Sequence, residues 1–96
     1  MAHFVYILAN RPNGAIYVGS TRNLAARMDQ HHRSRAGSHA DRYNIKTLVY
    51  FERHATTLEA VHREKRLKRW RRAWKNELIE AENPMWRDLS RELPLF

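Results

Sequence analysis

Two short apolar runs separated by a turn are the feature that most limits what this chain can fold into. Residues 3–9 and 16–19 are rich in β-branched and aromatic side chains, and both runs are too short for helices. Between them, Pro12 fixes φ at the first corner and Gly14 tolerates a positive φ. The sequence therefore predicts an antiparallel hairpin, in which successive side chains alternate between two faces.

A third strand is predicted over residues 47–53, and a first helix runs from Asn23, its N-cap, to about His32. The turn before this helix is expected to carry Gly19, Ser20 and Thr21. One face of the helix combines two apolar and two polar residues: Leu24, Arg27, Met28 and His31. The apolar pair would fix the helix on the sheet, so the polar pair would be held in place beside it. The polar residues 33–46 predict a loop.

A second helix is expected to begin at Thr56, which has capping-box spacing with Glu59. The pattern bends near residues 70–72 and continues as a third helix that ends at Asn83-Pro84. The remaining apolar residues up to Phe96 predict a tail packed on the domain. We therefore expect a single domain over residues 1–96 of α/β (α+β) class, with room for one sheet and a few helices.

The composition narrows the class of protein. The chain has 96 residues, no cysteine and a formal net charge of +8. This length predicts one modest core, and the absence of cysteine excludes disulfides and cysteine-based zinc sites. No apolar run approaches the roughly 20 residues of a membrane span, and no signal-peptide pattern is present. We expect a cytoplasmic protein without a membrane partner.

The positive charge is concentrated in residues 62–75, which hold eight Lys and Arg and one acid. This composition favours a polyanionic partner, above all nucleic acid, over a basic helix on a membrane surface. The residues expected to contact nucleic acid are Arg63, Lys65, Lys68, Arg69, Arg71 and Arg72. We expect Trp70, Trp74 and Trp86 to be core residues rather than platforms for stacked bases.

Five polar residues on the hairpin and on the first two helices could act on a phosphodiester: Tyr6, Tyr17, Arg27, His31 and Glu64. A phenol can assist removal of a proton, a guanidinium suits charge on phosphoryl oxygens, and one carboxylate can hold a hydrated divalent ion. Each residue also has a structural explanation. The tyrosines suit strands, Arg27 and His31 could form a solvated edge, and Glu64 could pair with Lys68.

The order and spacing of several motifs resemble the GIY-YIG nuclease superfamily. These are Val5-Tyr6-Ile7, Tyr17-Val18-Gly19, Ser20-Thr21, Asn23-Leu24, Arg27-Met28 and His31, although the first motif lacks its glycine. Residues 63–70 and Asn83-Pro84-x-Trp86-x-Asp88-Leu89 further resemble the small, stand-alone bacterial members. The resemblance covers nearly the whole chain and implies a small three-stranded antiparallel sheet flanked by about three helices.

The resemblance also implies a function. It predicts an endonuclease that uses Mg²⁺ or Mn²⁺ to hydrolyse DNA, structured or single-stranded. Its relatives would include DNA repair enzymes. Tyr6 or Tyr17 would assist as general base, Arg27 would steady the phosphate, and His31 would support the nucleophile or the phosphate. Glu64 would hold the metal. The alternatives are a non-catalytic nucleic-acid-binding module on the same fold and a binder of anionic membranes or acidic proteins.

Overall fold

The computed structural model describes residues 2–33 and 45–93, with the side chains of residues 31–33 excepted. Most of the loop expected over residues 33–46 lies outside these ranges. The elements are β1 (His3–Ala9), β2 (Ile16–Thr21), α1 (Leu24–Arg33), β3 (Thr47–His54), α3 (Thr57–Arg69), α4 (Arg72–Glu82) and the 3₁₀ helix η1 (Leu89–Glu92). None of the helices in the described ranges has the length and apolar character needed to cross a bilayer.

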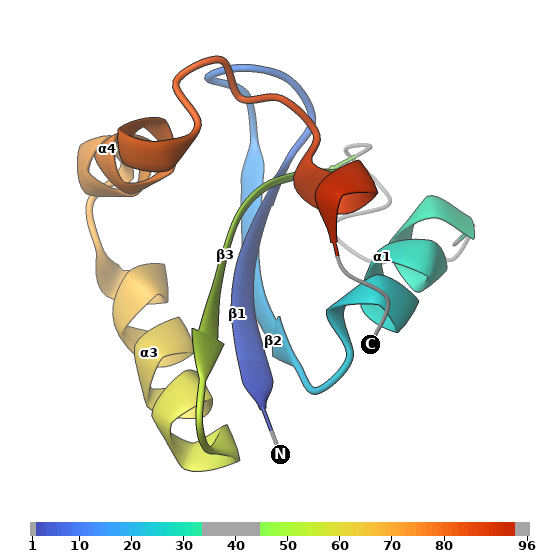
Figure 1. The fold of residues 1–96 in the computed structure, drawn as a ribbon. Helices are drawn as coiled ribbons and strands as arrows, with labels where there is room; N and C mark the ends of the chain where they lie inside the picture. The colour runs from blue at the N-terminus through green and yellow to red at the C-terminus, as the bar shows by residue number, and fades with distance from the viewer. Residues whose placement is uncertain (1, 34–44, 94–96) are drawn as a thin grey trace.

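The three strands form one antiparallel sheet in the order β2-β1-β3, as the sequence predicts (Figure 1). The central strand β1 is buried along its whole length. Tyr6 of β1 lies opposite Gly19 of β2 on one side and Phe51 of β3 on the other. The edge strand β2 continues to Thr21, so Gly19, Ser20 and Thr21 belong to the strand and the expected turn starts later. These three residues therefore have side-chain directions set by the pleat.

Helices cover both faces of the sheet (Figure 1). On one face, Val5 and Ile7 pack with residues of α3 and α4, including Leu67 and Ile79. On the other face, Phe4, Tyr6 and Leu8 pack with Leu24 and Met28 of α1, and η1 adds Leu89. The tail is packed on the domain as far as Leu93, and residues 94–96 lie outside the described ranges. Two small cores thus share one sheet.

The hairpin turn uses a different residue from the one expected. Asn13, with φ of 57°, occupies the left-handed region, and Gly14 does not. The amide of Gly14 donates to the carbonyl of Arg11 at 2.9 Å, which places Pro12 and Asn13 at the two central positions. Asparagine tolerates a positive φ there better than most residues. Gly14 is required for space instead, because a β-carbon would collide with the side chain of Asn10.

The break between α3 and α4 forms without glycine or proline. Trp70 and Arg71 both leave the helical region, with ψ near 150° for each. Trp70 is half-buried against the core and Trp86 is buried, but Trp74 is 48% exposed. The core prediction is therefore wrong for Trp74, because the break redirects the chain and α4 buries Ile79 rather than its first turn.

Asn83 ends α4, as expected, and also connects this helix to β3. A bulge shifts the pairing of β3 with β1, so that Tyr50 and Leu48 have partners in β1 while Val49 between them has none. The buried Asn83 amide donates to the Val49 carbonyl at 3.0 Å and to the Arg87 carbonyl at 2.9 Å. Its Oδ1 accepts from the Arg87 amide at 3.1 Å. One side chain therefore satisfies three backbone groups where strand pairing is interrupted.

Candidate active site

Tyr6 and Tyr17 meet above Gly19 on the face of the sheet that α1 covers. Their ring centroids are 6.3 Å apart, and Tyr6 is only 1% exposed. A β-carbon at Gly19 would lie 2.6 Å from Tyr6 Oη and 3.0 Å from Tyr17 Cε1. Gly19 is therefore needed for close approach, and the Tyr6 phenol lies over the backbone of the edge strand.

Arg27 reaches the same place from α1, near enough for its charge to act on the Tyr6 phenol. The start of this helix is fixed locally. Thr21 Oγ1 accepts from the Asn23 amide at 3.2 Å, and Asn23 Oδ1 accepts from the Ala26 amide at 3.0 Å, which confirms Asn23 as the N-cap. Since Leu24 and Met28 are buried, the helix face that carries Arg27 is held against the sheet. The side chain of His31 lies outside the described part of the chain.

Glu64 approaches β2 from α3, on the opposite face. Ser20 Oγ donates to Glu64 Oε1 at 2.6 Å, and Lys68 Nζ lies 2.7 Å from Oε2, the pair expected from their i,i+4 spacing. Burial alone would raise the pKa of Glu64. The hydrogen bonds from Lys68 and Ser20 outweigh burial and lower the pKa below its usual value. Glu64 is therefore a carboxylate at neutral pH.

An open pocket of about 520 Å³ joins these elements at the edge of the sheet. It is lined in part by His3 of β1, Ser20 and Thr21 of β2, Arg27 and Gln30 of α1, and Val61 of α3. Ser20 thus contributes to the pocket and also holds Glu64. The pocket is therefore lined by Arg27, from the helix on one face of the sheet, and by Ser20, which hydrogen-bonds Glu64 on the other face.

His3 and Ser20 are site residues that the sequence analysis did not assign. His3 is buried, its ring contacts Thr57 Oγ1 at 3.3 Å, and burial followed by the charge of Arg22 lowers its pKa. Both residues follow from the alternation of their strands, since His3 shares a face with Val5, and Ser20 lies opposite Val5. Strand register, which the sequence leaves open, was the missing signal.

The Tyr6 phenol is the site group whose pKa is shifted most clearly. Burial is the main reason that its pKa is raised above the ordinary value, and the neighbouring Tyr17 and the charge of Glu64 act in the same direction. Arg27 opposes them without cancelling them. Tyr6 therefore stays protonated at neutral pH and can donate a hydrogen bond.

The donor set around Glu64 suits a hard divalent cation with few protein ligands. No group of three or more His, Cys, Asp or Glu residues that could hold a metal occurs within residues 2–33 and 45–93. Glu64 supplies a single carboxylate beside the Ser20 hydroxyl. Mg²⁺ commonly retains several waters and takes one or two protein carboxylates, so this oxygen pair fits such an ion.

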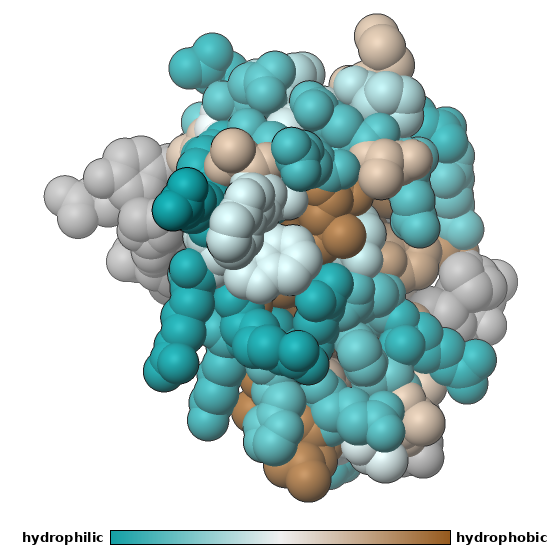
Figure 2. Space-filling view, turned by 90° about the vertical axis from the view of Figure 1, so that its left-hand side faces the viewer, coloured by the Kyte–Doolittle hydropathy of each residue, from teal (hydrophilic) through white to brown (hydrophobic). Residues whose placement is uncertain are grey.

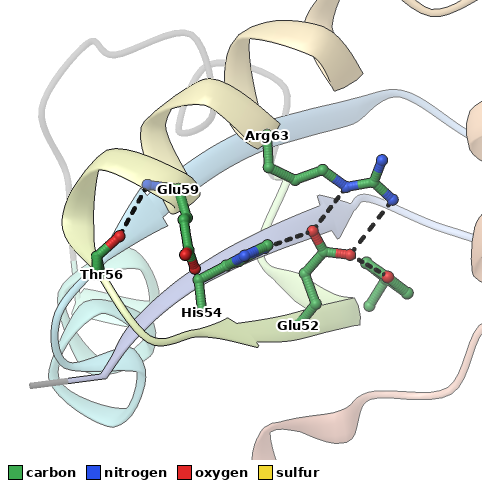
Figure 3. A network of polar contacts seen from close by, with 6 residues as sticks. Glu52, His54, Thr56, Glu59 and Arg63 are labelled. Carbon is green, nitrogen blue, oxygen red and sulfur yellow. Dashed lines mark hydrogen bonds and ion pairs between the residues drawn. The ribbon is translucent and has the colours of Figure 1, made fainter.

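A second polar network fixes α3 on β3 (Figure 3). Glu52 accepts from Arg63 Nε at 2.7 Å, from Tyr50 Oη at 2.5 Å, and lies 2.9 Å from His54 Nε2. Arg63 is thus turned inward to β3, although it was expected to contact nucleic acid. Its neighbour Glu64 contacts the edge strand β2. Consecutive residues of α3 therefore bind the helix to both edge strands of the sheet.

This network predicts an acid-sensitive component of stability. Burial would raise the pKa of Glu52, but hydrogen bonds from Arg63, Tyr50 and His54 outweigh it and lower the pKa. A lowered carboxyl pKa stabilises the fold above the unfolded-state value of about 4.3, and this stabilisation disappears as the pH falls through the folded-state value. We expect the free energy of unfolding, measured with urea from pH 7 to 3, to fall more steeply for the wild type than for Glu52→Gln. Equal slopes would show that Glu52 is not the acid-sensitive group.

The other basic residues expected to contact nucleic acid differ in what they contact. Lys68 pairs with Glu64, and Arg72 donates to Asn76 Oδ1 at 2.9 Å and to the Gly14 carbonyl. Lys65, Arg69 and Arg71 are exposed. Figure 2 shows the face formed by α3 and α4, where hydrophilic side chains predominate. Some basic side chains of residues 62–75 therefore make contacts within the protein, and others face solvent.

Known proteins that are similar to this chain point to one family. The family model described as the GIY-YIG catalytic domain matches residues 2–77. UPF0213 proteins of Staphylococcus aureus strains Mu50 and N315 are each 33% identical over 79 residues, which covers 82% of this chain and 95% of theirs.

The fold has a counterpart in a solved structure. The solution NMR structure of a UPF0213 protein from Bacillus halodurans is similar, with a TM-score of 0.56 and 23% identity. The similarity covers 95% of this chain and 96% of that one. Because the sequence match and the fold agree over most of the chain, this protein belongs to the GIY-YIG family of nuclease domains, among its small single-domain bacterial members.

Proposed function

We propose that this protein is a divalent-metal-dependent endonuclease that hydrolyses phosphodiester bonds of DNA. The observation that supports the proposal is the arrangement of four groups about the edge strand β2. The paired phenols of Tyr6 and Tyr17 and the Arg27 guanidinium lie on one face, and the ionised Glu64 lies on the other, held by Ser20. Arg27 and Ser20 line the pocket between them, whereas Tyr6, Tyr17 and Glu64 lie outside its lining. These are the groups that hydrolysis of a phosphodiester requires, and they occur in a chain of a nuclease family.

Arg27 is assigned to the scissile phosphate. It lines the pocket, and its guanidinium is a permanent cation with planar donors suited to phosphoryl oxygens. The first turn of α1, which carries Asn23 and Ala26, lies at the same pocket. The helix dipole places partial positive charge at this end of α1, and this charge favours an anion. Arg27 and this helix start would therefore bind the phosphate and stabilise the charge that develops on its oxygens.

The two tyrosines are assigned different roles. Tyr6 is buried and its pKa is raised, so we assign its neutral phenol to positioning the neighbouring Arg27. Tyr17 is only partly buried and is the phenol that can meet solvent, so we assign it to the attacking water. His31, one helical turn after Arg27, is assigned to support the phosphate or the nucleophile.

Glu64, with the Ser20 hydroxyl beside it, is the residue that would hold Mg²⁺ or Mn²⁺. The ion, when bound, supplies positive charge that polarises the phosphate and stabilises the leaving oxygen. Ser20 and Lys68 both contact the carboxylate and so set its orientation. The remaining basic residues of α3 and α4, including Lys65 and Arg69, would attract the DNA backbone without regard to sequence.

Nicking of supercoiled and branched DNA tests the proposal. We expect the wild type to nick one of these substrates with Mg²⁺ or Mn²⁺ and to lose the activity with EDTA. Arg27→Ala should reduce the rate about 100-fold, because it removes one donor from the developing charge. Arg22→Ala, which removes an exposed cation at the rim of the same pocket, is the matched control and should change the rate less than 10-fold.

The same assay separates the enzyme from a non-catalytic binding module. A wild type that binds DNA but cleaves none of these substrates with either metal would contradict the proposal and favour the module. A wild type whose cleavage is unaffected by Arg27→Ala would contradict the assignment of the phosphate site.

A further inference from the structure

An exposed aromatic and basic surface lies outside the candidate active site, where α3 ends and α4 begins. Trp74 is 48% exposed, and its ring packs edge to face on Trp70 at 6.1 Å between centroids. The Arg71 guanidinium lies 5.4 Å from the centre of the Trp74 ring. We call these three residues, together with Arg72 and Lys75, the Trp74 platform.

The platform has a rigid base. Trp70 packs against the core, and the Arg63 guanidinium lies 5.0 Å from the centre of its ring. Arg63 is itself held by the carboxylate of Glu52 at 2.7 Å. A continuous series of contacts therefore runs from β3 to the exposed ring of Trp74. An aromatic ring fixed in this way loses little conformational freedom when it is covered by a ligand.

The charge around the exposed ring is of one sign. Arg71, Arg72 and Lys75 all lie within five residues of sequence, and none of them is paired with a carboxylate in the described part of the chain. Lys75 Nζ lies 3.4 Å from the Lys68 carbonyl, and burial together with the nearby Arg72 lowers its pKa. An anion at this place would relieve the crowding of like charges.

We propose that the Trp74 platform binds single-stranded nucleic acid, with one unpaired base stacked on Trp74 and the flanking phosphates on Arg71, Arg72 and Lys75. In a duplex the faces of the bases are covered by their neighbours, so an exposed indole ring cannot stack on them. Only the basic groups of the platform could then contact the duplex. An unstacked base has a free face, and stacking on an aromatic side chain is a common means of holding single strands. The inference rests on the proposed function and specifies its substrate as DNA with an unpaired segment.

Binding without cleavage tests the platform. Fluorescence anisotropy in EDTA would compare a labelled 20-nucleotide oligothymidine with a 20-base-pair duplex, for the wild type, Trp74→Ala, Trp74→Phe and Met85→Ala. We expect Trp74→Ala to weaken single-strand binding about 10-fold or more, and duplex binding less than 2-fold. Trp74→Phe should recover most of the single-strand affinity. Met85→Ala removes another exposed apolar side chain, outside the platform, and should bind as the wild type does.

Three results would overturn the platform: a wild type that does not bind the oligothymidine, an equal loss for both substrates in Trp74→Ala, or unchanged single-strand binding in that variant. Tight binding to vesicles of anionic phospholipid that depends on Trp74 would also overturn it, in favour of a membrane surface. Because EDTA removes metal-dependent cleavage from the measurement, the platform and the proposed enzyme can fail separately. Single-strand binding that depends on Trp74, without cleavage in Mg²⁺ or Mn²⁺, would retain the platform and reject the nuclease.

Discussion

Glu64→Ala is expected to lower the rate of metal-dependent DNA nicking roughly 1000-fold. In the proposed site this side chain is the one carboxylate that would hold the divalent ion, and such an ion contributes several kcal/mol to stabilisation of the transition state. Within the described part of the chain, the Glu64 carboxylate bonds to Ser20 and Lys68, and Lys68 is largely exposed. The variant should therefore keep its fold and its affinity for DNA, which anisotropy and circular dichroism can verify.

Two control variants separate the role of the carboxylate from that of its surroundings. Glu77→Ala removes an exposed carboxylate from α4, with the same change in net charge, and should nick DNA at the wild-type rate. Lys68→Ala removes the ion-pair partner of Glu64 but keeps the carboxylate, so its effect should stay below about 10-fold. Nicking by Glu64→Ala at a rate close to that of the wild type would show that the metal, if required, is held elsewhere.

Asn83→Ala is expected to destabilise the fold by about 3 kcal/mol. The substitution removes three hydrogen bonds to backbone groups, and it leaves the Val49 carbonyl without this donor at the bulge of β3. A buried polar group that loses its partner destabilises a protein by roughly 1–3 kcal/mol. Urea denaturation at neutral pH measures the difference in free energy of unfolding between wild type and variant. The comparison requires that both proteins have the same m-value.

Asn76→Ala is the matched control on the same helix. Asn76 accepts one hydrogen bond, from Arg72 Nε at 2.9 Å, at an exposed position. Its removal should change the free energy of unfolding by less than about 1 kcal/mol. If Asn83→Ala were no more destabilising than Asn76→Ala, the connection between α4 and the bulge would contribute little to the fold.

The secondary structure of this chain was largely predictable because local signals were strong. Short runs of β-branched and aromatic residues, Pro12 in a turn and side-chain caps at Asn23 and Thr56 act within a few residues of each other. One exception is the hairpin turn, where either of two neighbouring residues can adopt a positive φ. Asn13 takes the positive φ expected of Gly14, and both residue types tolerate this conformation.

The order of the motifs predicts Tyr6, Tyr17, Arg27 and Glu64 as site residues, but it does not predict how they are arranged. The role of Gly19 depends on the register that places Tyr6 opposite it. Register also turns Ser20 toward Glu64. These positions follow from strand pairing over many residues, and no local pattern specifies that pairing.

The sequence by itself determined the hairpin, the three helices, the family and the concentration of positive charge in residues 62–75. Only the tertiary structure decided which of those charges face solvent. It directs Arg63 to Glu52 and leaves Trp74 exposed beside Arg71, although all of these residues except Glu52 belong to one basic stretch. The physical reason is that charge and periodicity are properties of the local chain, while burial and partnership depend on what a distant strand brings to the same place.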